Sequence, residues 1–581
     1  MSDVASLRPL AAVLVSAIAI PLIVGSYRRP NLREFWTIAV AVAKVTIVGS
    51  MVPGVLDGTV YVTDFGAYVA DISFVLRVDS LGLLFGLLAS ALWVVTSFYS
   101  IGYMRGLSED SQTRYFASFA ASVSTAIGVA FAGNLVTLFI FYELLTVATY
   151  PLVAHDETAE ARAAGRKYLA YTFIGGVAVL AGTVLVFSMA GTTSFTPGGI
   201  GDLATADPAL ARLAFALLVG GFGVKAALMP MHSWLPDAMV APTPVSGLLH
   251  AVAVVKSGVF GIARVTLDVF GPETMQDLGV GLPLAAVAAF TLLTASIIAL
   301  RKDNLKRRLA YSTISQLSYI VLGLGVLSGE AVVGGLLHIP AHAFMKLTLF
   351  FCAGAIHVET HTDDISDMAG IGKRMPLTMA AFAVAAAGMA GIPLVAGFVS
   401  KWYLLIGSVS AGQEIFAVVL LVSGMLNIAY FWPIVYQAFF ETPDAHDEKP
   451  LIESPFGGLF GSASGESTPV DGTTVKADGG DAVDDDANHD GEDHDEHSQP
   501  DHETHDNETG AHAEHDDHHH HGGPPAGGWD QRNWRGSEST WFMLGPILAA
   551  ATGALLLGIV PATAVFLEIV QKVAINVGVM A

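Results

Sequence analysis

Apolar runs recur along almost the whole chain, separated by short polar or charged segments. Each run holds about 20 residues, enough to cross a hydrocarbon core of roughly 30 Å as an α-helix. The breaks at glycine, proline and charge predict an all-α polytopic membrane protein with fourteen transmembrane helices. Their expected ranges are 8–26, 33–53, 80–103, 113–131, 134–153, 168–190, 208–229, 244–268, 281–300, 308–327, 331–357, 375–408, 414–440 and 541–571.

The segment 60–76, between the second and third predicted helices, has a different pattern. It is rich in Val, Tyr, Phe and Ile and contains Gly66, which is typical of two strands joined by a turn. We expect a β-hairpin outside the membrane there. Residues 1–112 then form an N-terminal region of three helices and this hairpin.

Prolines interrupt two of the predicted helices. The seventh, 208–229, carries Lys225 shortly before Pro230, and the twelfth, 375–408, contains Pro393 and then Lys401. Proline removes a backbone donor and clashes with the preceding turn. Broken helices at corresponding positions of two halves indicate an ion path between inverted repeats. We therefore expect two inverted five-helix repeats, formed by helices 4–8 (residues 113–268) and helices 9–13 (residues 281–440).

The composition agrees with a membrane protein and excludes several other classes. The chain is 53% hydrophobic and 14% charged, whereas soluble domains carry about 25% charged residues. Its single cysteine, Cys352, rules out an internal disulfide and a cysteine-based metal or iron–sulfur site. No glycine-rich phosphate loop follows a strand, so we expect no nucleotide, cofactor or intramembrane metal.

The net charge of −23 belongs to one segment. Residues 441–530 hold 25 of the 52 acidic residues, two of the 29 basic residues and 12 of the 19 histidines. Such a composition predicts a disordered insertion, which we bound at 441–535. The histidine run 518–521 could bind a divalent metal, but a solvated insertion is the favoured interpretation. An acidic exposed segment also fits a high-salt cytoplasm such as that of haloarchaea.

Basic residues follow the odd-numbered predicted helices, as in the loops 28–33 and 301–308. Because cytoplasmic loops carry the excess of Lys and Arg, we expect both termini outside and the acidic insertion in the cytoplasm. The last predicted helix then lies in a C-terminal region, residues 541–581.

Five charged residues lie inside apolar helices: Glu143, Lys225, Lys256, Lys346 and Lys401. A charge at the centre of a bilayer costs roughly 2.5–3.5 kcal/mol on insertion scales. A buried lysine holds its proton weakly, and a nearby carboxylate strengthens that hold. The five residues therefore indicate a path for protons.

Histidines extend this path. His338, His342 and Lys346 are spaced at i, i+4 and i+8, so they share one helical stripe. His250, six residues before Lys256, could relay protons or pack as a structural histidine. The link after helix 7 holds His232 and Asp237, which could end the path at one face or only cap and turn the chain. Lys401 could end the path or extend to the surface.

Three segments carry a resemblance: Phe141-Tyr-Glu-Leu, residues 224–238 and residues 242–250. They resemble the proton-translocating subunits shared by respiratory complex I and Mrp-type cation/proton antiporters, over about residues 80–440. Segments 342–356 and 397–404 are most similar to the D subunit of the Mrp antiporter. The resemblance implies fourteen helices in two inverted repeats. It also implies a Glu143–Lys225 pair, a central relay through Lys256 and helix 11, and a second-half lysine at Lys401.

The chain departs from the family pattern in two places. Leu394 stands where a second proline is common, and the acidic insertion is an addition. The sequence has no long lateral helix after 541–571, which disfavours the largest subunits of both complexes. Lysine at 401, where one kind of complex I subunit has glutamate, argues against that kind.

These observations predict a secondary transporter subunit that is not itself an enzyme. It would move protons, coupled to Na⁺ efflux, among the other subunits of an Mrp-type complex. The alternative is a pumping membrane subunit of an NADH- or ferredoxin-linked quinone reductase or a membrane hydrogenase, whose chemistry lies in partner chains. A third interpretation is a scaffold whose histidine-rich insertion buffers metal.

Overall fold

The computed structural model describes residues 2–69, 72–442, 522–525, 528–532, 538–562 and 565–580. The chain divides into two units, one of them formed by Met1–Pro450 and His521–Ala581. The other, Leu451–His520, lies outside the described residues. Almost all of the predicted insertion 441–535 therefore lies outside them too, including the histidine run 518–521.

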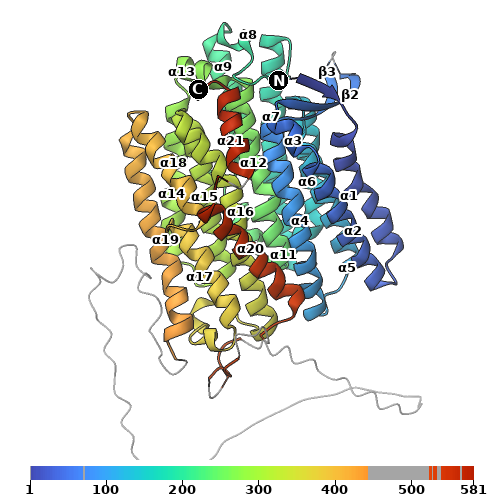
Figure 1. The fold of residues 1–581 in the computed structure, drawn as a ribbon, viewed down its shortest axis with the longest axis vertical. Helices are drawn as coiled ribbons and strands as arrows, with labels where there is room; N and C mark the ends of the chain where they lie inside the picture. The colour runs from blue at the N-terminus through green and yellow to red at the C-terminus, as the bar shows by residue number, and fades with distance from the viewer. Residues whose placement is uncertain are drawn as a thin grey trace, which may run out of the picture. The chain divides into compact units, whose positions relative to one another are not determined.

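The first unit is a bundle of long helices (Figure 1). In chain order these are α1 (Arg8–Gly25), α2 (Pro30–Gly49), α4 (Ser80–Gly106), α5 (Gln112–Ala130), α6 (Leu135–Val153), α7 (Ala159–Ala190), α9 (Pro208–Lys225), α12 (Val254–Arg264), α14 (Gly281–Leu300), α15 (Leu305–Val326), α16 (Gly329–Thr360), α17 (Pro376–Ala390), α18 (Ala396–Ser410), α19 (Glu414–Phe440), α20 (Trp541–Ile559) and α21 (Val565–Asn576). Short helices connect them: α3 (Val52–Leu56), α8 (Gly201–Ala204), α10 (Trp234–Asp237), α11 (Thr243–Gly247) and α13 (Gly271–Leu278).

The all-α polytopic fold is confirmed. Among the described residues, 12 helices are long and apolar enough to span a membrane. The two predicted spans outside this set are 113–131, which forms α5, and 375–408, which divides into α17 and α18 of 15 residues each. The count of fourteen crossings stays a prediction.

Besides 375–408, two further predicted helices are not continuous. The range 541–571 was wrong as one helix, because α20 ends at Ile559 and Pro561 follows, where a proline cannot continue the helical hydrogen bonding. The range 244–268 contains two π-helical segments, η2 (Leu248–Val252) and η3 (Val265–Val269). Such segments insert an extra residue per turn and are frequent at functional sites.

The predicted β-hairpin is present, and one more strand joins it. Strands β2 (Thr59–Val69) and β3 (Ile72–Val78) pair antiparallel, and β1 (Ser2–Ala5) pairs parallel to β2. The sheet lies at the same end of the bundle as α8 and α13 (Figure 1). We call this the sheet end, and the other the opposite end.

A buried ion cluster of Arg264, Asp79 and Asp268 lies at the sheet end. Arg264 donates hydrogen bonds of 2.7 and 2.8 Å to the two carboxylate oxygens of Asp79, and one of 2.7 Å to Asp268. Asp79 also accepts from the backbone of Gly82 and so caps α4. This cluster joins the start of α4 to the end of α12.

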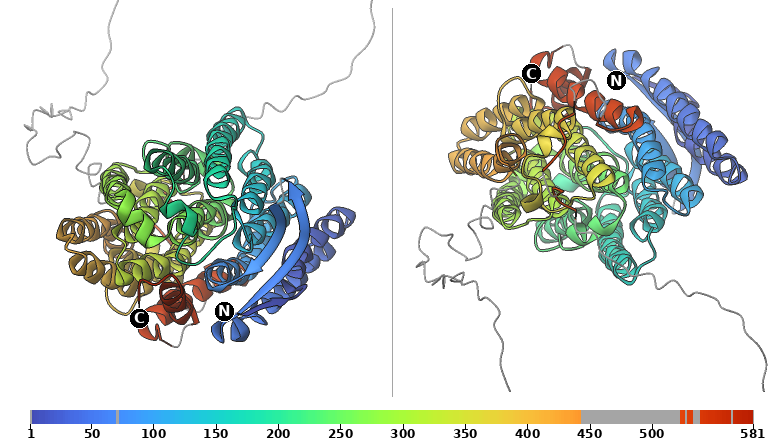
Figure 2. Two further views of the ribbon diagram at one scale, coloured as in Figure 1. Left: turned by 90° about the horizontal axis from the view of Figure 1, so that it is seen from above. Right: turned by 90° about the horizontal axis from the view of Figure 1, so that it is seen from below.

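The C-terminal helices pack along the bundle. α20 contacts α4, α16, α17 and α18, and Figure 2 shows the red C-terminal helices against the yellow and blue ones. The carboxylate of Glu538, just before α20, is buried and accepts from the backbone of Leu377 and Thr378. It therefore caps α17 from a distant part of the chain, because it accepts hydrogen bonds from N–H groups that have no partner within that helix.

Replacing this cap tests how the C-terminal helices are anchored. Glu538→Gln keeps the side chain's size but sets an amide N–H₂ against backbone donors. We expect it to lower the stability of the purified protein by about 2 kcal/mol, measured as a lower midpoint of thermal unfolding. The matched control is Glu568→Gln, an exposed residue of α21, which should change stability by less than about 0.5 kcal/mol. Equal midpoints for the two variants would contradict the capping role.

Candidate functional site

The predicted path residues lie on six helical segments inside the bundle. Glu143 is on α6, Lys225 on α9, Lys256 on α12 with His250 on η2, and Lys401 on α18. His338, His342 and Lys346 are on α16. All are buried except Glu143, which is partly exposed on the side of the bundle.

Lys225 is the last residue of α9, so this helix ends four residues before the predicted end at 229. Its ammonium donates to the backbone oxygen of Tyr142 and lies 3.4 Å from the centre of the Tyr142 ring. The Tyr142 hydroxyl in turn donates to the Gly221 carbonyl over 3.1 Å. The ring and the carbonyl thus hold the ammonium beside α6, and sequence reasoning missed Tyr142.

Glu143 is the next residue after Tyr142, so the structure brings the expected carboxylate and lysine close. Among the described residues, however, no Glu143–Lys225 ion pair falls within 4.0 Å. Glu143 Oε1 is buried without a hydrogen-bond partner. A Cβ on Gly176 of α7 would lie 2.1 Å from that oxygen, so the glycine leaves room for the carboxylate.

Lys256 and His342 join the two halves of the bundle. The Lys256 ammonium lies 2.8 Å from His342 Nδ1, although 86 residues separate them in sequence. The rings of His342 and His338 stack with centres 6.1 Å apart. His338 then contacts Ser400 Oγ at 2.8 Å and Gln316 Oε1 at 2.9 Å. These contacts place protonatable and polar groups in a row from α12 to α18, although His342 Nε2 is buried without a hydrogen-bond partner.

Lys346 does not continue the histidine stripe through its side chain. Its ammonium turns to α15, where it donates to the Leu309 carbonyl over 3.1 Å and to the Ser312 hydroxyl. His250 packs against the Phe350 ring at 4.7 Å, and both of its ring nitrogens are buried without a partner. Both residues therefore lie beside the Lys256–His342 contact rather than in it.

Lys401 reaches back across the break in its own helix. It lies one turn into α18, is 7% exposed, and donates to the Met389 carbonyl of α17 over 2.5 Å. The Tyr319 ring lies 4.7 Å from its ammonium. Lys401 therefore does not extend to the surface. Leu394, in the break, has a left-handed φ of 75°, which costs a non-glycine residue about 1 kcal/mol.

His232 and Asp237, the possible path ends, lie apart from Lys225. Asp237 forms an ion pair of 2.5 Å with Lys167 of α7. His232 lies with its ring centre 6.2 Å from that of Tyr311, and its Nδ1 has no partner. No hydrogen bond found among the described residues joins either of them to the lysine series.

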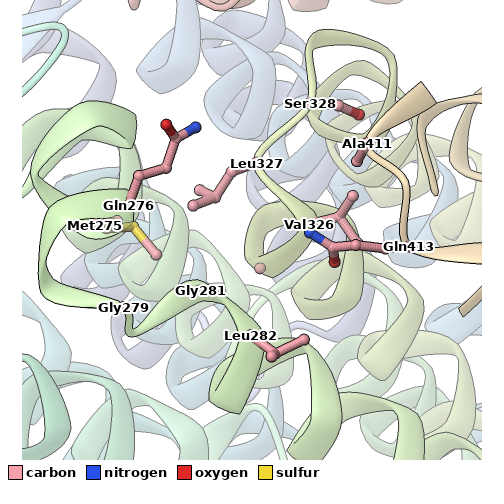
Figure 3. Close-up of a pocket in the computed structure, with 11 residues that line it drawn as sticks. Met275, Gln276, Gly279, Gly281, Leu282, Val326, Leu327, Ser328, Ala411 and Gln413 are labelled. Atoms are coloured by element: carbon pink, nitrogen blue, oxygen red, sulfur yellow. The ribbon is translucent and has the colours of Figure 1, made fainter. Parts of the chain in front are cut away.

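Two hollows lie at the two ends of the bundle. At the sheet end, a pocket of about 430 Å³ is lined by Met275, Gln276, Leu282, Leu327, Ser328 and Gln413 (Figure 3). None of the predicted path residues is among its lining residues. At the opposite end, a polar pocket of about 490 Å³ is lined by residues that include Glu109, Asp156, Lys306, His357 and Asp363.

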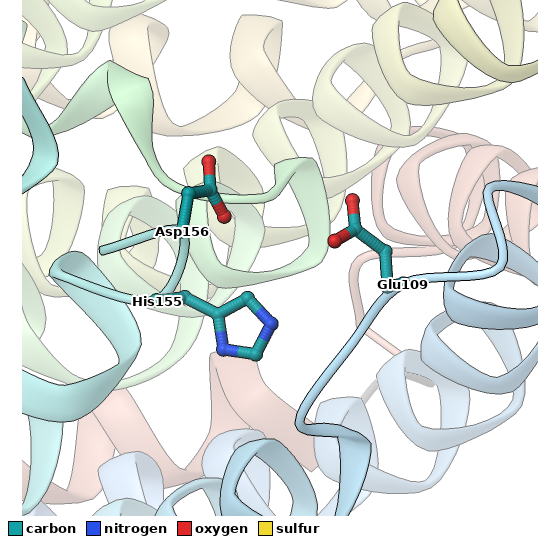
Figure 4. A group of neighbouring side chains, drawn as sticks. All are labelled: Glu109, His155 and Asp156. Carbon is teal, nitrogen blue, oxygen red and sulfur yellow. The ribbon is translucent and has the colours of Figure 1, made fainter. Parts of the chain in front are cut away.

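Glu109, His155 and Asp156 form a group beside that polar pocket (Figure 4). Their ligand atoms lie within 4.8 Å of one another, so these residues could hold a metal ion. Burial and the neighbouring Asp156 raise the pKa of Glu109. Burial also raises the pKa of Asp156. Sequence reasoning missed this group, because Glu109 is more than 40 residues away from the other two.

Comparisons with known proteins show the family of this chain. The sequence pattern of the NADH:quinone oxidoreductase/Mrp antiporter transmembrane family matches residues 132–427. The chain is 35% identical, over 383 residues, to the N subunit of the NADH-quinone oxidoreductase of Desulforudis audaxviator, covering 63% of this chain and 74% of that protein. The chain belongs to the NADH:quinone oxidoreductase/Mrp antiporter family.

The antiporter relatives are longer proteins. The A subunit of the Na(+)/H(+) antiporter of Alkalihalophilus pseudofirmus is 33% identical over 419 residues, covering 67% of this chain and 51% of that one. The A/B subunit of a probable K(+)/H(+) antiporter of Rhizobium meliloti is 34% identical, with 38% of its length covered. The chain thus spans about half or less of these two relatives.

Two solved structures share the fold. One is the Mrp complex of a Dietzia species, with a TM-score of 0.73, 21% identity and 98% of both chains covered. The other is a membrane-bound sulfane sulfur reductase, an archaeal respiratory membrane complex, with a TM-score of 0.67 and 25% identity. It covers 75% of this chain and 88% of that one. The fold thus recurs in a multisubunit antiporter and in a respiratory complex.

Gly258 of α12 tests the packing that sets the position of Lys225. A Cβ there would lie 2.3 Å from the Ala226 nitrogen and 2.8 Å from the Lys225 carbonyl carbon, and backbone atoms cannot turn aside. We expect Gly258→Ala to destabilise the complex by about 2 kcal/mol, measured by thermal unfolding. The control is Gly220→Ala on α9, where nothing lies within 4 Å of the added carbon. A Gly258→Ala variant as stable as this control would contradict the packing argument.

The raised pKa of Glu109 gives a pH-dependent prediction. The folded protein holds the Glu109 proton more tightly than the unfolded chain does, so stability falls as pH rises from about 4.5 through the raised pKa. Glu109→Gln removes that loss, and its thermal midpoint should exceed the parent's by more at pH 8 than at pH 4. Glu273→Gln, an exposed residue of α13, is the control. If Glu109→Gln raises the thermal midpoint equally at pH 4 and at pH 8, the prediction is wrong.

Proposed function

We propose that this chain is the proton-translocating subunit of a multisubunit Na⁺/H⁺ antiporter of the Mrp type. The observation that carries the proposal is the Lys256–His342 contact of 2.8 Å, which connects protonatable groups of the two halves inside an apolar bundle. Protons move along the series Glu143, Lys225, Lys256, His342, His338 and Lys401, with His250 and Lys346 beside it.

Each member of the series exchanges a proton with a neighbour when their separation or surroundings change. Glu143 favours the protonated form of Lys225 when the two approach, and Lys225 releases its proton when they separate. Lys256 passes the proton to His342, whose ring stacks on His338. His338 contacts Ser400, the residue before Lys401. His232 and Asp237 connect the first half to one membrane face.

The arrangement of the halves belongs to the same proposal. Two inverted repeats are formed by residues 113–268 and 281–440. The support for this is that each range contains a helix that ends at a break near a lysine. The termini lie outside and the insertion lies in the cytoplasm, as the basic loops indicate. The acidic insertion points to a high-salt cytoplasm such as that of haloarchaea.

The driving force is the membrane potential and the proton gradient. One elementary charge crossing 100 mV is worth about 2.3 kcal/mol, so inward protons drive Na⁺ outward through other subunits of the complex. The chain itself performs no chemistry. We propose Na⁺ as the coupled ion because of the Na(+)/H(+) antiporter relative of Alkalihalophilus pseudofirmus. The K(+)/H(+) antiporter relative of Rhizobium meliloti makes K⁺ the ion to test beside it.

A second candidate function is a pumping membrane subunit of a quinone reductase or a membrane hydrogenase-like complex. Its support is the NADH-quinone oxidoreductase relative at 35% identity and the fold shared with the sulfane sulfur reductase. Redox chemistry would then lie in partner chains. Vesicles carrying the whole complex separate the two: a Na⁺ gradient alone drives proton flux only in the antiporter.

Replacing Lys225 tests the proton path. In vesicles carrying the complete complex, Lys225→Ala should lower Na⁺-driven proton flux by about tenfold or more, because a positioned proton carrier is lost. The matched control is Lys373→Ala, an exposed lysine outside the series, which should keep the flux of the parent. Flux is followed with a pH-sensitive dye, in Na⁺ and in K⁺. If the Lys225→Ala complex kept the proton flux of the parent, the proposed proton path would be wrong.

A further inference from the structure

A sixth intramembrane charge lies outside the series described above. Lys44 is on α2, within the predicted span 33–53, and its side chain is fully buried. Its ammonium donates to Ser16 Oγ of α1 and, over 3.5 Å, to the Val123 carbonyl of α5. The Trp93 ring of α4 lies 5.2 Å away. Four helices therefore surround this one amine.

The surroundings of Lys44 repeat those of the lysines in the second half. Lys346 has the same three kinds of neighbour, namely a serine hydroxyl, a backbone carbonyl and an aromatic ring, the ring of Phe431 at 5.7 Å. Lys401 has a carbonyl and a tyrosine ring. The acceptors are neutral in all three, so each amine can give up its proton without leaving a carboxylate unpaired.

Stability does not account for a lysine at this position. Among the described residues, no carboxylate lies within 4.0 Å of Lys44. The groups that face it from the packed helices α1, α4 and α5 are Ser16, Trp93 and Val123, none of them charged. Burying an unpaired ammonium costs several kcal/mol, and an apolar residue of similar size would avoid that cost.

Other polar side chains lie on the buried face of α2, nearer the opposite end of the bundle. Beyond Val40 and Ala41 this face carries Thr37, Glu34 and Arg33, with Glu34 about 15 Å from Lys44 along the helix. Glu34 is buried there and accepts hydrogen bonds from Arg105 at the end of α4. Buried polar groups therefore lie between Lys44 and the opposite end of the bundle, apart from the central series.

We propose that Lys44 is a further proton-binding site of this subunit, exchanging protons with the opposite end of the bundle along the buried face of α2. The inference rests on the proposed function but concerns a part of the chain before residue 132, where the family match begins. The N-terminal helices then carry protons as well as enclosing the repeats.

The test uses two replacements with opposite electrical properties. Lys44→Gln keeps hydrogen-bond donors for Ser16 and Val123 but binds no proton. Lys44→Arg keeps the charge but does not release its proton. A proton-exchanging site tolerates neither, so both variants should assemble and lose about tenfold in Na⁺-driven proton flux in vesicles carrying the whole complex. Arg29→Gln, an exposed cation before α2, is the control.

A structural cross-link predicts a different result. If either variant assembles and carries the parent's flux between pH 6 and 9, or if neither assembles, Lys44 is a hydrogen-bonding cross-link and the proposal is overturned. Lys225→Ala is measured in the same preparation. Full flux in that variant would sink the proposed function, whereas full flux in Lys44→Gln alone overturns only this inference.

Discussion

An amine buried among apolar helices needs acceptors, because an unsatisfied polar group in the hydrocarbon region costs several kcal/mol. This requirement organises the interior of the bundle. A carbonyl inside a regular helix is already paired with a backbone N–H but keeps a second lone pair, whereas the last carbonyls of a helix have no backbone partner. Lys401 finds its acceptor at Met389, where α17 ends, and Lys225 finds one at Tyr142 on α6. Aromatic rings complete both sites.

Close backbone packing makes these sites possible. Gly175 of α7 and Gly221 of α9 face each other so closely that a Cβ on either would lie less than 3.0 Å from the other's carbonyl oxygen. Gly258 brings α12 equally close to the end of α9. Small residues are the usual means by which membrane helices approach. The glycines therefore determine where Lys225 sits, although they carry no chemistry themselves.

The protonatable residues lie on helices at the two breaks and on the long helix α16. α16 runs without interruption through Pro340 and carries both histidines between the two breaks. Its contact with Lys256 crosses from one half of the chain to the other. Under the proposed function, a subunit built in this way moves protons laterally, whichever redox or cation-handling partners it has.

The sequence by itself determined the membrane class, the positions of most helices, the β-hairpin and the charged residues Glu143, Lys225, Lys256 and Lys401, because these follow from the length of apolar runs and the cost of burying charge. The partners of those charges were decided only by the tertiary structure. Whether the amine of Lys346 meets a histidine or Ser312 depends on helix rotation and crossing angle, which apolar periodicity does not specify. The helix breaks could be predicted, because proline and glycine determine them locally. The carbonyl acceptors that bind the lysines could not be predicted.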